Sequence, residues 1–375
     1  MRFDLVKVLF DHQCFVQQQY GGVSRYHYQL IKELNKLKDV KSILSLKYSN
    51  NFYINEDKSF EVKKFFPNHK FYFKRTILDY INRLSTIPNL KKGDYDIFHP
   101  TYFGTYFLKH LNAKPFIVTV YDSIHEKYPE IINSIDRTLE YKKEIISKAN
   151  LILAISNSAK NDLINIYKIP AEKIKVVYLA ASINKNFALS KEQLSLPEKY
   201  ILFVGNRDFY KNFKNFIQAI APLLKEQKDL FLISAGGGGF SNDEIKYFRS
   251  MQIENKVIYK NADDASLATL YSNALAFIFP SLYEGFGIPA LEAMNCDCPV
   301  IMSNTSSLPE VGGDAAIYFE PNDIEDIKNK IAKVIFDKEL RKELIEKGKI
   351  QRSKFSFEKT AKETLEVYEK LAAVR

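Results

Sequence analysis

Two carboxylates, Glu284 and Glu292, are the residues of this 375-residue chain best suited to chemistry. They stand eight positions apart in the run 279–294, and Tyr283 immediately precedes the first of them. Because a carboxylate accepts paired hydrogen bonds, both acids suit the vicinal hydroxyls of a sugar or a ribose. The alternative is an ordinary strand–loop–helix connection, in which an N-terminal Glu only complements the helix dipole.

The segment between the two acids predicts a helix start that can hold an anion. A strand is expected to end at Phe279, and Pro289 suits the first position of a helix. The N–H groups before the proline would then lie at the positive end of the helix dipole, where an anion is favoured. The residues that offer them are Gly285, Phe286, Gly287 and Ile288.

A second loop offers cations. Arg207 and Lys211 lie four positions apart, directly after Gly205 and Asn206 and the expected strand 200–204. If they converge on one side of a turn, the planar fork of Arg and the compact charge of Lys both suit phosphate oxygens. A solvated basic turn is the alternative.

Two glycine loops also follow expected strands. Gly21 and Gly22 could let the backbone approach a ligand closely at a helix start, although they do not form a G-x-G-x-x-G pattern. Gly236 and Gly237 open a run of four glycines that is suited to lie over a nucleotide. A simple turn and a flexible linker are the respective alternatives.

The run around Glu284 and Glu292 resembles the Glu-x7-Glu motif of the retaining glycosyltransferases of family four. The resemblance implies that Glu284 holds the hydroxyls of a donor sugar and that Glu292 holds the nucleotide ribose. It also implies that the amides between them contact the sugar and the phosphates. The resemblance is dense over 200–323, sparser before 180 and weak over 47–94.

Two other loops share this resemblance. Arg207 and Lys211 are similar to the diphosphate-binding pair of the family, and the loop that begins at Gly21 and Gly22 is similar to its front-domain glycine loop near the donor phosphates.

One loop departs from the family pattern. The family often reads His-Asp after the strand expected over 116–121, with the His beside the sugar, whereas this chain reads Tyr121-Asp122. Asp122 is therefore retained, and His125 is the candidate to replace the missing His. A lone His can equally be a packed or surface residue. The catalytic candidates are thus Glu284, Arg207, Lys211, Asp122 and His125.

Short apolar, β-branched runs alternate with amphipathic stretches along the whole chain, which is typical of parallel sheets built from βαβ units. The expected strands are 6–10, 97–99, 116–121, 151–155, 175–179, 200–204, 230–234, 256–259, 276–279, 299–302 and 317–319. Eleven strands exceed one ordinary doubly wound sheet, so we expect two Rossmann-like domains, a GT-B fold in the terms of the resemblance.

The boundary is expected near the polar run 182–186, which gives an acceptor-binding domain over 1–185 and a nucleotide-sugar-binding domain over 186–375. The last helix is a candidate to pack back on the first domain. Ligands of open α/β sheets bind beyond the carboxyl ends of the strands, so we expect the active site in a cleft between the two domains.

Charge is unevenly spread. The chain has 54 basic and 45 acidic side chains, but residues 1–185 alone have 29 basic against 18 acidic. Three cysteines are too few for a disulfide framework, and neither a signal peptide nor a membrane span is expected. The Asp-x-Asp pattern 94–96 precedes its strand, on the wrong edge for a ligand, so no metal site is predicted.

The basic, aromatic stretch 63–75 suits an anionic membrane surface, in which rings bury and amines meet lipid. A solvated loop is the alternative, and single-stranded nucleic acid is a rival partner that would leave the Glu pair unexplained. We therefore expect a cytoplasmic protein without a nucleic-acid partner, with the inner face of the plasma membrane as a candidate peripheral site.

Together these features predict a metal-independent, retaining hexosyltransferase of surface polysaccharide synthesis, such as lipopolysaccharide synthesis. It would move a mannose-like or glucose-like hexose from GDP- or UDP-hexose to a glycan or a lipid-diphosphate-linked glycan, with no obligatory cofactor. A sugar-nucleotide epimerase, a glucan phosphorylase of the same fold, and a basic nucleic-acid-binding protein are the alternatives.

Overall fold

The computed structural model describes residues 5–131 and 137–373. The chain divides into two compact units, one formed by Met1–Leu179 with Phe357–Arg375 and the other by Ala180–Ser356. The division therefore falls between residues 179 and 180, and the last helix belongs to the first unit. Each unit is an α/β structure with parallel strands.

The first unit contains two three-stranded parallel sheets joined by one bridge between Phe98 and Phe116. One sheet has the order β2-β1-β3, and the other has the order β4-β5-β6. The strands are β1 (Val6–Phe10), β2 (Val40–Leu44), β3 (Ile97–His99), β4 (Ile117–Val120), β5 (Leu151–Ala154) and β6 (Ile174–Val176).

β2 is the one strand of the first unit that sequence patterning does not predict. Its sequence VKSIL has a single fully buried position, Val40, because β2 lies at the edge of its sheet. An edge strand tolerates the exposed Lys41 and the half-buried Ser42, so its pattern is not that of a buried strand.

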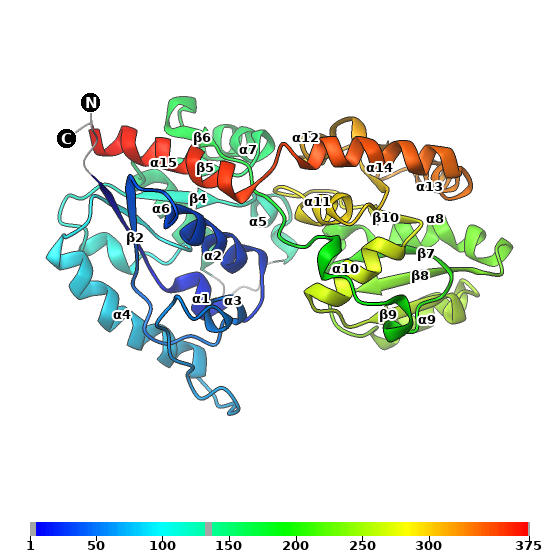
Figure 1. Cartoon of the computed structure of the whole chain (residues 1–375), viewed down its shortest axis with the longest axis horizontal. Coiled ribbons are helices and arrows are strands. Elements are labelled where there is room, and N and C mark those ends of the chain that lie inside the picture. Colours follow the sequence, from blue (N-terminus) through cyan, green and yellow to red (C-terminus); the bar gives the residue numbers. More distant parts are fainter. Residues whose placement is uncertain (1–4, 132–136, 374–375) are drawn as a thin grey trace. The chain divides into compact units, whose positions relative to one another are not determined.

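Eight helices of the described residues cover the first unit (Figure 1). They are α1 (Gln13–Gln17), α2 (Gly22–Leu34), α3 (Phe52–Glu56), α4 (Lys74–Lys92), α5 (Ile124–Lys127), α6 (Thr138–Lys148), α7 (Asn157–Tyr167) and α15 (Phe357–Ala373).

The C-terminal helix α15, drawn in red in Figure 1, packs on α2 and also contacts β1 and β3. It buries Ala361, Thr364, Leu365 and Tyr368, which share one face of the helix. The Tyr368 hydroxyl is hydrogen-bonded to Nδ1 of His99 at 2.7 Å. This docking joins residues that are 269 positions apart to one core.

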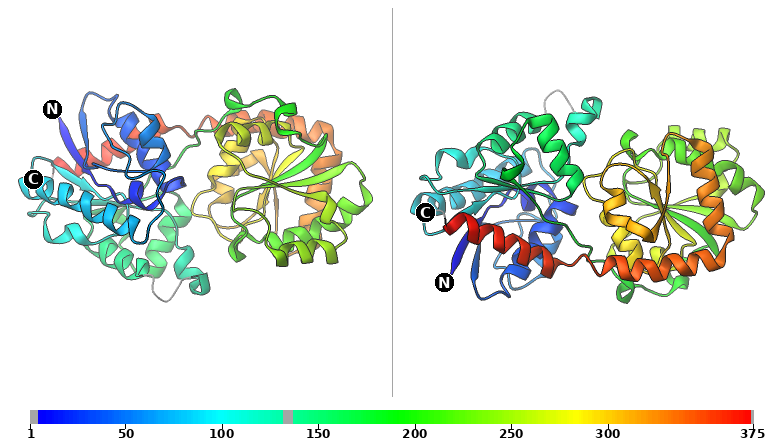
Figure 2. Two further views of the ribbon diagram at one scale, coloured as in Figure 1. Left: turned by 90° about the horizontal axis from the view of Figure 1, so that it is seen from below. Right: turned by 90° about the horizontal axis from the view of Figure 1, so that it is seen from above.

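The second unit has one six-stranded parallel sheet in the order β12-β11-β10-β7-β8-β9, with helices on both faces (Figure 2). Its strands are β7 (Lys199–Val204), β8 (Leu230–Ala235), β9 (Val257–Lys260), β10 (Ala276–Phe279), β11 (Val300–Ser303) and β12 (Ala316–Phe319). Its helices are α8 (Phe213–Glu226), α9 (Asn242–Ser250), α10 (Asp264–Asn273), α11 (Ile288–Asn295), α12 (Leu308–Gly312), α13 (Ile324–Phe336) and α14 (Lys338–Arg352).

The strand order of the second unit reverses between β7 and β10. From β7 the chain continues through β8 and β9 on one side, and from β10 it continues through β11 and β12 on the other. The loops after β7 and β10 therefore diverge at a topological switch point, where open α/β sheets bind ligands. These are the loops that carry Arg207, Lys211 and Glu284.

No helix among the described residues is both long and apolar enough to cross a membrane.

Candidate active site

The centre of the site is an ion pair between Lys211 and Glu284. The ammonium of Lys211 lies 2.6 Å from Oε1 of Glu284, and the same oxygen accepts a hydrogen bond from the Ser281 hydroxyl at 2.6 Å. Glu284 is 8% exposed, so its charge is stabilised mainly by these two donors. The other carboxylate oxygen, Oε2, receives no hydrogen bond from the described residues.

Two serines in the loop after the neighbouring strand β11 hold the Glu284 loop in place. The Glu284 N–H donates to Oγ of Ser306 at 2.9 Å, while the Ser307 hydroxyl donates to the carbonyls of Glu284 and Phe286 at 2.9 and 2.8 Å. The Leu282 N–H also donates to the Tyr210 carbonyl, which lies in the loop after β7. The loop is therefore preorganised by its neighbours on both sides.

Gly287 starts helix α11 in a conformation that only glycine adopts easily. Its φ is 112°, and a Cβ there would lie 2.9 Å from Cδ2 of Leu308. α11 begins at Ile288, so Pro289 occupies its second position, one residue later than expected. Tyr283 and Phe286 are buried, so this loop can offer a ligand mainly its backbone groups.

Glu292 lies on the first turns of α11 and is 6% exposed. Its Oε2 accepts a hydrogen bond from the buried Tyr271 hydroxyl at 3.3 Å. Burial, with the Glu292 charge beside it, raises the pKa of Tyr271 well above its ordinary value. The tyrosine therefore remains a hydrogen-bond donor and orients the carboxylate.

The Arg207 side chain contacts the glycine loop after β8, and it does not converge with Lys211 on a common partner. Its Nη1 donates to the Gly236 carbonyl at 3.1 Å, and Nη2 donates to the carbonyls of Gly238 and Gly239 at 3.0 and 2.9 Å. Its Nε lies 2.5 Å from Glu244. Thus Arg207 holds the glycine loop. Their spacing predicts that Arg207 and Lys211 act as a pair, but in this structure Arg207 pairs with Glu244 and Lys211 pairs with Glu284.

The glycine loop packs closely on the loop after β7. A Cβ at Gly237 would lie 2.9 Å from both Cα of Asn206 and the carbonyl oxygen of Gly205. Gly205 itself has a φ of 130°, and its N–H donates to the Ala235 carbonyl at 2.9 Å. The second unit thus joins the loops after β7, β8, β10 and β11 at one edge of its sheet.

Gly21 and Gly22 start α2 in the first unit, as expected for a helix start. The Gln18 side chain accepts a hydrogen bond from the Ser24 N–H at 3.0 Å. The N–H groups of Gly22 and Val23 have no hydrogen-bond partner among the described residues, which leaves them available to an anion.

Tyr121, which stands where the family has its His, points into the core. Its side chain is 8% exposed, and its hydroxyl is hydrogen-bonded to Nε2 of His27 at 2.6 Å. Burial raises the pKa of Tyr121 well above its ordinary value, so it cannot serve as a titrating group near neutral pH. His125 lies half-buried on α5 and makes no hydrogen bond or ion pair with the described residues.

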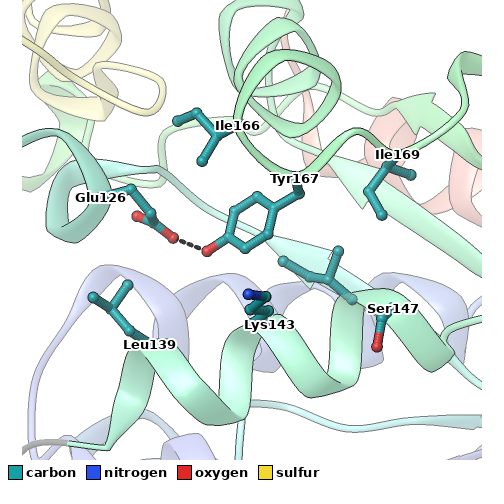
Figure 3. Close-up of a pocket in the computed structure, with 8 residues that line it drawn as sticks. Glu126, Leu139, Lys143, Ser147, Ile166, Tyr167 and Ile169 are labelled. Carbon is teal, nitrogen blue, oxygen red and sulfur yellow. Dashed lines mark hydrogen bonds between the residues drawn. The ribbon is translucent and has the colours of Figure 1, made fainter.

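The Asp122 loop is anchored by Lys142 on α6. The buried ammonium of Lys142 lies 2.5 Å from the Asp122 carbonyl and 2.6 Å from Glu126. Glu126 also accepts a hydrogen bond from Tyr167 at the rim of a pocket between α6 and α7 (Figure 3). No predicted site residue lines that largely apolar pocket, which holds about 450 Å³.

Sequence reasoning missed the residues that support the site. Ser281, Tyr271, Glu244 and Lys142 each hold a predicted residue or its loop, as do Ser306 and Ser307. Their partners lie 3 to 37 positions away, and their residue types are common, so no spacing marks them. The Asp-x-Asp pattern precedes β3 as expected, and its Asp94 pairs with Lys7 at 2.6 Å.

Two family models match successive parts of the chain. A model described as "Glycosyltransferase Family 4" matches residues 20–184, and one described as "Glycosyl transferases group 1" matches residues 184–351.

Two curated relatives match the chain over part of its length. O-antigen chain mannosyltransferase B of Escherichia coli is 33% identical over 61% of this chain and 62% of its own. A Campylobacter jejuni relative is 27% identical over 58% of this chain and 60% of its own, and its name describes an N-acetylgalactosaminyltransferase that acts on a diphospho-undecaprenol-linked sugar. The chain thus spans less than two thirds of these relatives.

Two solved structures share the fold over nearly the whole chain. Sucrose-phosphate synthase from Thermosynechococcus elongatus superposes with a TM-score of 0.76 at 19% identity, and covers 99% of this chain and 100% of its own. Anabaena HepE in complex with UDP and glucose superposes with a TM-score of 0.71 at 16% identity, over 96% and 99%. The predicted GT-B fold is confirmed.

Proposed function

The chain belongs to the glycosyltransferases of family four, and on that premise we propose that it transfers a hexose from a nucleoside-diphosphate sugar to a glycan acceptor. The donor is a GDP- or UDP-hexose with a mannose-like or glucose-like sugar. The acceptor is a glycan, free or linked to a lipid diphosphate, in surface polysaccharide synthesis. The observation that carries this proposal is the Lys211–Glu284 pair at the switch point of the second unit.

The proposed mechanism is departure of the nucleoside diphosphate from an oxocarbenium-like sugar. Lys211 stabilises the charge that develops on the leaving phosphate, and Arg207 holds the glycine loop and adds positive charge there. Oε2 of Glu284 accepts hydrogen bonds from the sugar hydroxyls, while Glu292 accepts them from the ribose. The acceptor hydroxyl forms the new bond to the anomeric carbon on the face that the diphosphate leaves and gives its proton to the departing phosphate oxygen, so the anomeric configuration is retained.

In the first unit, the N–H groups of Gly22 and Val23 are proposed to bind an anionic group of a substrate. Asp122 and His125 are proposed to contact the sugar side of the substrate. We further propose that transfer needs no metal ion. If activity disappears in EDTA and returns with magnesium, this part of the proposal is wrong.

The first experiment replaces Glu284 by Gln. This variant keeps the size of the side chain but loses the charge that orients the sugar, so kcat/KM for hexose transfer should fall about 10²- to 10³-fold. Release of nucleoside diphosphate and the formation of glycosylated acceptor are the measurements. Glu339→Gln, an exposed carboxyl of the same unit, is the control. Full transfer activity in the Glu284→Gln variant would contradict the proposal.

A thermal-shift panel of GDP- and UDP-sugars would identify the donor. A ligand that binds only the folded state stabilises it by RT ln(1 + [L]/Kd), which is about 2.7 kcal/mol at a hundredfold excess over Kd. Product analysis then separates the alternatives: glycosyl transfer supports the proposal, whereas an epimer or a sugar phosphate supports an epimerase or a phosphorylase.

A peripheral position on an anionic membrane is the remaining part of the proposal. Its support is the large exposed aromatic residues of the basic stretch that precedes and begins α4. These are Phe66, Phe71, Tyr72 and Phe73.

A further inference from the structure

A polar pocket of about 720 Å³ lies in the first unit, apart from the residues discussed above. It is lined by α4, by the end of α1, by the segment after β3 and by the start of α6. In the first unit the strand order reverses between β1 and β3, because β2 lies on one side of β1 and β3 on the other. Val16 and Gln17 follow the carboxyl end of β1, and Tyr102 follows that of β3, so the pocket is lined by segments that leave the two strands at the switch point.

Three arginines line the pocket: Arg75, Arg83 and Arg137. Arg75 is exposed and makes no hydrogen bond or ion pair with the described residues. Arg83 pairs with Asp79 at 2.7 Å and lies over the Tyr106 ring, but its buried Nε has no hydrogen-bond acceptor among the described residues. Arg137 pairs with the exposed Glu140 at 2.9 Å and lies over the Tyr141 ring.

The acidic groups only partly balance these cations. Asp79 is the one carboxylate among the lining residues, and it is shared between Arg83 and Nε2 of His12, which lies 3.2 Å away. Counting also Glu140, which pairs with Arg137 outside the lining, the three guanidinium groups have two carboxylate partners among the described residues, so an excess of positive charge remains. The planar guanidinium groups of arginines in such a pocket can donate paired hydrogen bonds to the oxygens of phosphate groups.

A second face of α4 is apolar and exposed. Phe73 immediately before the helix, and Ile77, Tyr80 and Leu84 within it, are spaced by four, three and four residues, and each is at least 42% exposed. This spacing places them on one side of the helix, next to the pocket-lining side that carries Thr76, Asp79 and Arg83. The remaining side of α4 is buried in the first unit and carries Leu78, Asn82, Thr86 and Leu90.

The loop before α4 extends this apolar stripe. Phe66 and Tyr72 are 56% and 84% exposed, and Lys74 holds the loop to the helix through the carbonyls of Phe66 and His69 at 2.7 and 2.9 Å. Figure 1 shows the loop projecting from the N-terminal end of α4. One helix thus presents a basic pocket and, beside it, an aromatic surface with a basic rim.

We propose that this pocket binds the diphosphate of a lipid-diphosphate-linked acceptor, with the apolar stripe of α4 lying in the membrane interface that holds the lipid chain. The inference rests on the proposed function, because it names the class of acceptor. An amphiphile with a compact double phosphate joined to a hydrocarbon chain matches both faces of α4 at once. A phospholipid headgroup carries one phosphate and less charge, so three arginines favour the diphosphate.

The test measures binding of the full chain to phosphatidylcholine vesicles that contain a polyprenyl diphosphate. Vesicles with phosphatidylglycerol at equal negative charge and vesicles of pure phosphatidylcholine are the comparison arms. The variant Arg75→Ala/Arg137→Ala removes two exposed cations of the pocket, so its fold should be retained. Lys91→Ala/Lys92→Ala is the matched control, because it removes two exposed charges at the other end of α4.

The arginine variant should bind the diphosphate vesicles about tenfold more weakly than the parent chain, and the lysine control within about twofold of it. Equal binding by the arginine variant would overturn the proposal. So would equally tight binding of the parent chain to phosphatidylglycerol vesicles, since the surface would then recognise charge alone.

The proposed function is checked separately in the same proteins by thermal stabilisation with nucleoside diphosphates. The arginine variant should keep that stabilisation. If no nucleotide stabilises the parent chain, the proposed function fails, while the vesicle comparison still decides the diphosphate site.

Discussion

Lys211 pairs with the Glu284 carboxylate in the structure and with the leaving phosphate in the proposed mechanism. The Lys211 ammonium pairs with the carboxylate of Glu284, which is 8% exposed, and lies 5.6 Å from the centre of the Phe279 ring. A diphosphate arriving at the same loop would compete for that ammonium. The ion pair therefore holds the Lys211 and Glu284 side chains in position at the loop after β10.

Replacing Lys211 by Met should be destabilising because it leaves Glu284 without its cation. We expect a loss of about 3 kcal/mol in the free energy of unfolding, measured by urea denaturation. The double variant Lys211→Met/Glu284→Gln should recover part of that loss, with a coupling energy of about 1–3 kcal/mol. Additive effects of the two substitutions would show that the ion pair contributes nothing.

His99 makes the first unit sensitive to acid. It is fully buried between Tyr368 and Thr119, and burial lowers its pKa to about 3. In the unfolded chain the same imidazole takes up a proton below about pH 6.5. The unfolded state therefore binds more protons between these values, so the stabilisation is complete above pH 6.5 and is lost as the pH falls.

The expected slope from His99 is about 1.4 kcal/mol per pH unit below pH 6.5, and the buried His27 acts in the same direction. Hydrogen exchange in β1 and β3, followed from pH 7 to pH 5, would measure it. His99→Gln should reduce the slope, whereas His69→Gln, at an exposed site, should leave it unchanged. A slope that is unaffected by His99→Gln would contradict this assignment.

At the scale of elements, the start of α11 depends on backbone shape more than on side-chain chemistry. Gly287 turns the chain so that the loop after β10 can enter the helix, and the hydroxyls of Ser306 and Ser307 hold that loop from the β11 side. The loop after the neighbouring strand β11 thus fixes the position of Glu284.

Gly287→Ala tests this dependence. A side chain at φ 112° that also approaches Leu308 should cost about 2 kcal/mol of stability and should lower hexose transfer, because Glu284 would shift. Gly348→Ala is the matched control: it lies within α14, its Cβ would make an ordinary 3.4 Å contact with Met294, and it should be neutral or slightly stabilising. Unchanged transfer in Gly287→Ala would contradict the prediction.

At the scale of the whole molecule, the two units differ in charge and in how the chain builds them. Residues 1–179 with 357–375 contain 32 basic and 22 acidic side chains, whereas residues 180–356 contain 22 and 23. The basic excess therefore belongs to the unit with the arginine pocket. That unit also contains α15, which follows the second unit in the sequence.

A chain that ends at Ser356 should lose order in the first unit only. Without α15, β1, β3 and α2 lose their cover and His99 loses the Tyr368 hydroxyl, so their amide hydrogens should exchange faster. Peptides of β7 to β12 serve as the internal control and should keep their protection. Unchanged protection of β1 and β3 would show that α15 is dispensable for this unit.

The sequence alone determined the fold class and all but one strand, because buried parallel strands are continuous apolar runs. It also predicted the candidate site residues, because their motifs are local in sequence. It missed β2, since this edge strand has only one buried position and contains Lys41 and Ser42. The tertiary structure alone decided the partners: Lys211 pairs with Glu284, Arg207 holds the glycine loop, and Tyr121 packs against His27. It also brought Arg75, Arg83 and Arg137 to one pocket, since contacts between loops of different strands follow from strand order, which spacing along the chain does not encode.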